Sequence, residues 1–161
     1  MKSEFDENAS LMRDKFVYIE GYLDDYVEDF SLIMDEAERI LVIIEENNAS
    51  KQNYKRFCFL LNKIKGNSTI VGDKFVANIT AMLEDIALKL PELTQTDIFS
   101  QIVELMFYAF DELKNHMKTL RKEQFYPIIN EDIINKIQNM HSSIGAARDI
   151  ISQEDVDSLF E

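Results

Sequence analysis

Apolar residues recur three and four positions apart along most of the chain, which is the spacing of one face of an α-helix. Between residues 22 and 46 the rest of each turn is rich in acidic residues, so this stretch is predicted to be a long amphipathic helix. Only four glycines and two prolines interrupt the chain. We therefore predict an all-α protein. The first predicted apolar stripe holds Tyr26, Phe30, Ile33, Ala37, Ile40 and Ile44.

Capping and turn residues predict the limits of the next two helices. Ser50 is a predicted N-cap for a second helix that runs to about Gly66, and Gly72 closes the turn that follows. A third helix is predicted over 73–90, ending before Pro91, because proline cannot continue a helix without losing a hydrogen bond. The predicted inward residues are Tyr54, Phe57, Cys58, Leu61 and Ile64 in the second helix and Phe75, Ile79, Met82, Leu83 and Ile86 in the third.

Two further helices are predicted towards the C-terminus. Thr94 or Thr96 caps a fourth helix that reaches about residue 122, and Asn130 caps a fifth that frays near Ser142. Their predicted buried residues are Ile98, Ile102, Leu105, Ala109, Leu113, Met117 and Leu120, and then Ile133, Ile137, Met140 and Ile144. Short connections predict an antiparallel four-helix bundle over 21–125, with the fifth helix, 126–148, packed alongside. Residues 1–20 are predicted to form an acidic arm or a short helix.

Composition and charge narrow the classes of partner. A chain of 161 residues, 46% of them apolar, is long enough for one well-filled core and short for two domains. The net charge of −13 disfavours nucleic acid and membrane surfaces as partners, because both repel an acidic chain. The single Cys58 cannot form an internal disulfide, and no signal segment or long apolar run is evident. We expect a cytoplasmic protein.

The stretch 57–84 carries a recognisable motif: Asn62-Lys63-Ile64-Lys65-Gly66, then Gly72, then Leu83-Glu84. This pattern resembles the signature of histidine phosphotransfer (Hpt) domains, in which a helix bears His-x-x-Lys-Gly and a leucine–acid pair closes the next helix. The order and lengths of the predicted helices are most similar to the first domain of chemotaxis histidine kinases. One residue departs from the family pattern, because Asn62 occupies the place of the phosphoacceptor histidine.

The resemblance implies an Hpt fold that binds a response regulator's receiver domain. In the family the lysine steadies the phosphate and the small residue after it lets the receiver approach, and Lys65 and Gly66 match these positions. An amide lacks the basic nitrogen of imidazole, so Asn62 is not expected to accept phosphate. No metal site and no cofactor are expected, since the receiver supplies its own Mg²⁺. The predicted receiver-binding residues are Lys55, Phe59, Asn62, Lys63, Lys65, Gly66 and Thr69.

The charge of the second helix independently favours a docking face. Residues 51–65 contain five basic side chains and no acidic one, within a chain that is strongly acidic overall. A receiver's active site is a cluster of carboxylates, to which such a helix is complementary. The alternative is that these residues form an ordinary solvated face over the core.

The C-terminal segment 149–161 carries a second resemblance. It is similar to the short peptides with which the flagellar motor switch protein and the chemotaxis phosphatase of enteric bacteria bind the chemotaxis response regulator. Ser152 and Asp155 can form a capping box, after which Val156, Leu159 and Phe160 lie along one apolar edge. The alternative is an acidic end that merely finishes the fifth helix.

Four functions therefore remain open. The first is a pseudo-Hpt module that binds a receiver, with a histidine kinase as a further candidate partner. The second is a response-regulator phosphatase in which Asn62 positions a water molecule and Lys65 offsets phosphoryl charge. The third is a structural, homodimerising helix bundle, and the fourth is a phosphotransferase that uses another residue. His116 and His141 are predicted to be surface or half-buried helical residues, so neither is an expected acceptor.

Overall fold

The computed structural model describes residues 20–121 and 131–159, with side chains described for 22–120 and 131–145. This part of the chain is all-helical, as the sequence predicts, and contains no strand. None of its helices is long and apolar enough to cross a membrane. The predicted N-terminal arm lies, apart from Glu20, outside the described residues. The helices are α2 (Glu20–Glu45), α3 (Lys51–Val71), α4 (Lys74–Leu93), α5 (Ile98–Arg121) and α6 (Glu131–Leu159).

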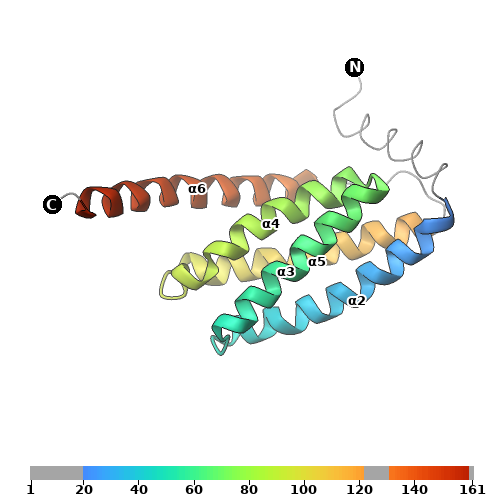
Figure 1. Cartoon of the computed structure of the whole chain (residues 1–161), viewed down its shortest axis with the longest axis horizontal. Coiled ribbons are helices and arrows are strands. Elements are labelled where there is room, and N and C mark those ends of the chain that lie inside the picture. The colour runs from blue at the N-terminus through green and yellow to red at the C-terminus, as the bar shows by residue number, and fades with distance from the viewer. Residues whose placement is uncertain (1–19, 122–130, 160–161) are drawn as a thin grey trace, which may run out of the picture.

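The helices pack around one hydrophobic core. Helix α2 contacts α3 and α5, and α4 also contacts α3 and α5, so within α2 to α5 each helix has two neighbours. Helix α6 lies against α4 and α5. Consecutive helices from α2 to α5 run in opposite directions and are joined by short turns (Figure 1). Among the described helices, α3 and α4 have the most extensive contact with each other.

Aromatic and aliphatic side chains fill the space between these helices. Phe57 of α3 and Phe110 of α5 are fully buried, and their ring centroids lie 6.1 Å apart in a tilted arrangement. Truncation of such a buried phenylalanine to alanine costs roughly 3–5 kcal/mol of the free energy of unfolding. Six residues predicted as core are only half-buried and pack at its edge: Tyr54, Cys58, Phe75, Met82, Ile98 and Met140.

Helix α3 begins as predicted and ends later than predicted. Ser50 accepts a hydrogen bond from the backbone nitrogen of Asn53, whose side chain accepts one from the Ser50 nitrogen in return, which completes a capping box. The helix passes through Gly66 and ends at Val71. A glycine inside a helix costs only about 1 kcal/mol. The burial of Ile64 and Ser68 on either side of Gly66 outweighs this cost, so the helix continues past the glycine. Gly72 ends the helix with φ at 83°, where glycine is favoured.

Two other predicted helix ends were wrong. Helix α4 includes Pro91 and continues to Leu93. Pro91 lies in the last turn, so the one hydrogen bond that its missing N–H removes, to the oxygen of Ala87, affects only the end of the helix. Helix α6 does not fray near Ser142 and continues to Leu159, so Ser152 lies within a helix and caps no helix start. The apolar residues Ile133, Ile137 and Ile144, all buried, hold the first half of α6 on the core.

Candidate functional site

Three polar side chains meet on the outer surface where α3 and α4 lie side by side. The Nζ atom of Lys65 lies 2.9 Å from Oε2 of Glu84. The Nδ2 atom of Asn62 donates longer hydrogen bonds to the same carboxylate, 3.3 Å to Oε1 and 3.4 Å to Oε2. The Lys65 side chain is 35% exposed and that of Glu84 is 17% exposed. We call these three residues the polar cluster.

Helical spacing puts two members of the polar cluster on one side of α3, and the packing of α4 against α3 brings in the third. Asn62 and Lys65 are three residues apart and therefore share one side of α3, while the neighbouring Leu83 points into the core and leaves Glu84 at the edge of α4. A carboxylate accepts hydrogen bonds only, so the amide nitrogen of Asn62 faces Glu84 and the amide oxygen is left as the group that can accept from water. Asn62 has no nucleophilic nitrogen to phosphorylate.

Phe59 lies on the exposed face of α3 as predicted. Its side chain is 53% exposed, and the guanidinium carbon of Arg56 lies 5.2 Å from the ring centroid. Arg56 also forms two hydrogen bonds with Glu36 of α2, at 2.9 and 2.8 Å. The guanidinium group is the largest cause of the lowered pKa of Glu36. Arg56 is therefore tied to α2, and the lysines of α3 carry the remaining basic character.

The other predicted receiver-binding residues share this outer surface. Lys55, Lys63, Gly66 and Thr69 are exposed. The hydroxyl of Thr69 donates to the backbone oxygen of Lys65 at 2.8 Å, so it is already used within the helix. A Cβ atom added at Gly66 would meet nothing within 4 Å. Packing inside the chain therefore does not require glycine at this position, although glycine weakens a helix.

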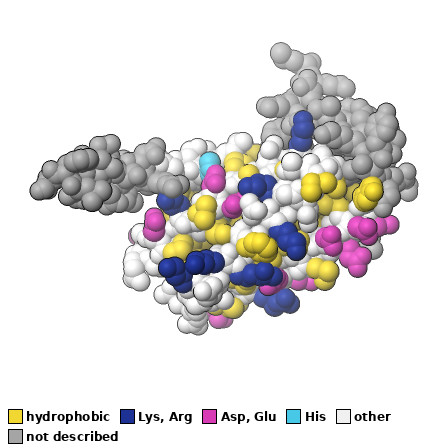
Figure 2. Space-filling model, in the orientation of Figure 1, with side chains coloured by type: hydrophobic (Ala, Val, Ile, Leu, Met, Phe, Trp, Pro, Cys, Tyr) yellow, Lys and Arg dark blue, Asp and Glu magenta, His cyan; other side chains and the backbone are white. Residues whose placement is uncertain are grey.

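The basic side chains of α3 are spread along one face of the molecule. Figure 2 shows Lys and Arg side chains over the region where Figure 1 places α3 and α4, with hydrophobic side chains among them. Acidic side chains gather instead over α2. Among the described residues, Lys51, Lys55 and Lys63 form no ion pair, whereas Lys65 pairs with Glu84. The surface is thus basic within an acidic protein.

The structure reveals a second polar group, which is buried and which the sequence did not indicate. Asp73 is fully buried at the N-cap of α4 and lies 2.7 Å from the Tyr26 hydroxyl and 2.9 Å from Nε2 of His116. The Tyr26 hydroxyl also lies 3.0 Å from Ser68. Burial, followed by the charge of Asp73, raises the pKa of Tyr26 well above its usual value. This network joins α2, α3, α4 and α5 at one end of the core.

The two histidines are therefore placed differently from each other. His116 is 4% exposed, so the prediction of a surface or half-buried residue was wrong for it. Its Nδ1 atom is buried and has no hydrogen-bond partner among the described residues. His141 of α6 is half-buried, and its Nε2 atom lies 2.9 Å from Oδ2 of Asp85 on α4. No group of three or more His, Cys, Asp or Glu residues suited to a metal ion occurs in the described part of the chain.

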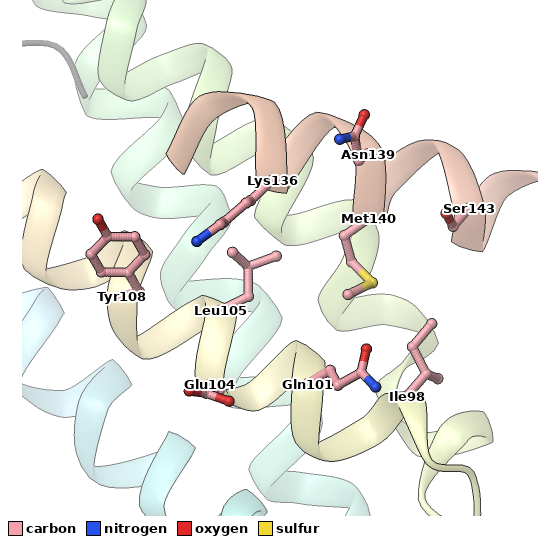
Figure 3. Close-up of a pocket in the computed structure, with 9 residues that line it drawn as sticks. All are labelled: Ile98, Gln101, Glu104, Leu105, Tyr108, Lys136, Asn139, Met140 and Ser143. Atoms are coloured by element: carbon pink, nitrogen blue, oxygen red, sulfur yellow. The ribbon is translucent and has the colours of Figure 1, made fainter. Parts of the chain in front are cut away.

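A separate hollow lies between α5 and α6 (Figure 3). Its walls mix apolar residues such as Leu105 and Met140 with polar residues such as Gln101 and Asn139. The Nζ atom of Lys136 lies 5.7 Å from the ring centroid of Tyr108 and 3.2 Å from a carboxylate oxygen of Asp132. None of the predicted site residues whose side chains the structure describes lines this hollow.

Comparison of the chain with protein-family models, with curated proteins and with solved structures found no match. Sequence reasoning placed Asn62, Lys65 and Phe59 on one exposed surface but did not name Glu84 as their partner. The signal was present, because Leu83-Glu84 was part of the motif that defined the site. The predicted tail residues Ser152, Asp155, Val156, Leu159 and Phe160 lie outside the described side chains.

Proposed function

We propose that this protein is a pseudo-Hpt module, an antiparallel four-helix bundle with an added helix that binds the receiver domain of a chemotaxis-type response regulator. The observation that carries the proposal is the polar cluster of Asn62, Lys65 and Glu84 on an exposed, lysine-bearing surface. Its members occupy the motif positions of an Hpt domain. An amide in place of the acceptor histidine means binding without accepting phosphate.

The proposed contact combines charge with one apolar anchor. Lys63 and Lys65 face the carboxylates of the receiver's active site, which also brings its own Mg²⁺, and Lys55 adds positive charge about two turns away on the same helix. Phe59 supplies exposed apolar surface beside them, and exposed aromatic residues are common anchors of interfaces. The open space above Gly66 lets the partner's backbone come close. The C-terminal segment 149–161 provides a second grip, and the assembly works in the cytoplasm.

Binding tests this proposal directly. Purified receiver domains from the same genome are titrated with the full chain by calorimetry, and we expect at least one to bind in the micromolar range or tighter. Phe59→Asp and Lys65→Glu should each weaken that binding about tenfold or more, because they place negative charge against carboxylates. Val42→Asp on α2 and Lys118→Glu on α5 are matched controls at exposed positions. Binding by no receiver, or equal binding by all variants, would contradict the proposal.

A phosphatase is the second candidate, favoured by the orientation of the Asn62 amide. Because Nδ2 faces Glu84, the amide oxygen is the end that can accept a hydrogen bond from a water molecule. A water held in line with a receiver's aspartyl phosphate would attack phosphorus, with Lys65 offsetting charge on the phosphoryl oxygens. Hydrolysis then yields inorganic phosphate and the free aspartate.

The two candidates are separated by the lifetime of the phosphorylated receiver. A phosphatase shortens that lifetime, and Asn62→Ala should abolish the gain, on the order of 10²-fold, while leaving binding within a few-fold. A sequestering module leaves the lifetime unchanged or prolongs it. A homodimerising bundle without receiver affinity would show neither effect.

A further inference from the structure

An apolar groove lies along the same pair of helices, α3 and α4, beyond the polar cluster. It has a volume of about 570 Å³. Tyr54 and Cys58 are half-buried in it, Ala87 is buried, and Leu88 is 55% exposed. Lys51 and Lys55 provide its charged groups, and no acidic residue within the described part of the chain lines it. We call this the α3–α4 groove, lined by Lys51, Tyr54, Lys55, Cys58, Ala87, Leu88 and Pro91.

The groove and the polar cluster form one continuous surface. Cys58 precedes Asn62 by four residues on α3, and Leu88 follows Glu84 by four residues on α4. Four residues are about one helical turn, so the groove begins roughly 6 Å from the cluster. The charge of Glu84 also contributes to the raised pKa of Cys58, which agrees with this proximity. An element lying along α3 and α4 would therefore touch both.

The lining limits what the groove can hold. The pKa of Cys58 is raised to about 11, chiefly by burial, so its thiol stays protonated near neutral pH and acts as an apolar wall. A furrow between two neighbouring helices is shaped to receive a ridge of side chains from a third. The lysines at the edge of the groove favour a bound element that carries acidic residues beside its apolar ridge. This local preference holds although the chain as a whole carries a charge of −13.

We infer that the α3–α4 groove holds an amphipathic helix of the partner, with an apolar residue against Leu88 and Cys58 and acidic residues beside Lys51 and Lys55. This inference rests on the proposed function, because the helix belongs to the receiver that docks on the polar cluster. It adds a second contact one turn away from the phosphoryl chemistry. A partner selected in this way is recognised by its acidic helix as well as by its active site.

Leu88→Glu and the double change Lys51→Glu with Lys55→Glu test the groove in the full chain. We expect Leu88→Glu to weaken binding of the receiver that wild type binds by about tenfold or more, because it places a charge in the apolar groove. The double lysine change should weaken binding several-fold and flatten its dependence on salt. Leu32→Glu on α2 and Lys118→Glu on α5 are the controls and should stay within twofold. Circular dichroism confirms that each variant is folded.

Alkylation of Cys58 gives a readout on the unmodified protein. The chain has one cysteine, so iodoacetamide alkylation at pH 9, read on the Cys58 peptide by mass spectrometry, reports on the groove even in the presence of a receiver with cysteines of its own. Saturating receiver should slow this reaction several-fold if a helix occupies the groove.

These outcomes distinguish a failure of the groove inference from a failure of the proposed function. Full receiver binding by the groove variants, together with unchanged Cys58 alkylation, overturns the groove inference and leaves the proposed function intact. If the wild type binds no receiver, both the groove inference and the proposed function are contradicted. Self-association of the wild type that Leu88→Glu abolishes would assign the groove to a second copy of the chain and overturn the partner named here.

Discussion

Lys65 of α3 forms an ion pair with Glu84 of α4, with 2.9 Å between Nζ and Oε2. The lysine that would meet a receiver's phosphate or carboxylates is thus already held by a carboxylate of its own chain. A docking receiver competes with Glu84 for this charge. The pair therefore sets both the position of Lys65 and part of its affinity for a partner.

Glu84→Gln should tighten receiver binding about three- to tenfold at low salt, because it removes the competing charge and keeps the side chain's shape. Calorimetry at two salt concentrations measures the effect, which should shrink as salt rises. Glu104→Gln on α5 is the matched control at an exposed position. Weaker binding by Glu84→Gln would mean that Glu84 chiefly positions Lys65 instead of competing for it.

Asn62→His should restore phosphotransfer to some degree, because Lys65, Gly66 and Glu84 remain in place around position 62. Wild type should acquire no acid-labile phosphate from a phosphorylated receiver or kinase, whereas the variant should become labelled. His116 is only 4% exposed, so it is shielded from a docked receiver. Label on His116 or His141 of the wild type would exclude a pseudo-Hpt protein.

Tyr26→Phe should lower the free energy of unfolding by about 1–3 kcal/mol at pH 7, since it removes a buried hydrogen bond to Asp73. The folded-state pKa of Tyr26 is raised, so its contribution is present below about pH 10, the usual pKa of tyrosine, and is lost as the pH rises further. The difference in the free energy of unfolding between wild type and Tyr26→Phe should therefore be smaller above about pH 10 than at pH 7. Urea unfolding at pH 7 and above pH 10 measures this difference. Tyr22→Phe is the control, because Tyr22 is 67% exposed. An equal effect of both changes would contradict the role of the network.

Cys58 should react slowly with thiol reagents. With a pKa of about 11, the thiolate fraction at pH 8 is on the order of 10⁻³, and alkylation should be about 100-fold slower than for an ordinary exposed thiol. The rate should rise about tenfold for each pH unit up to pH 10. Iodoacetamide labelling followed by mass spectrometry measures this, with the urea-unfolded chain as the reference. A fast reaction at pH 8 would mean that the groove is open enough to solvate the thiolate.

Deletion of residues 152–161 should weaken receiver binding by more than the affinity of the same segment as a free peptide would indicate. Tethering raises the effective concentration of the second grip once the bundle is bound. Calorimetry of the full chain, the shortened chain and the peptide provides the comparison. Equal affinity of the full and shortened chains would leave the segment with no part in docking.

The sequence by itself determined the all-helical class and most of the core. The three- and four-residue spacing of apolar side chains is a local property of one helix, so it identified Phe57, Leu61 and Ile64 as inward residues without knowledge of their neighbours. It also placed the capping serine, Ser50, because a cap bonds to the backbone only a few residues away. The same local logic put Phe59 and Asn62 on one side of α3, whereas Lys65 was expected at the site from its place in the motif.

Only the tertiary structure decided which distant residues meet. Glu84 joins Asn62 and Lys65 because α3 and α4 pack side by side, and Asp73 joins Tyr26 and His116 across three helices. Such pairings depend on the rotation of each helix about its axis, which periodicity within one helix does not specify. Tertiary packing also decided where α3 ends. Because residues on both sides of Gly66 are buried, the helix continues to Val71 although glycine weakens a helix.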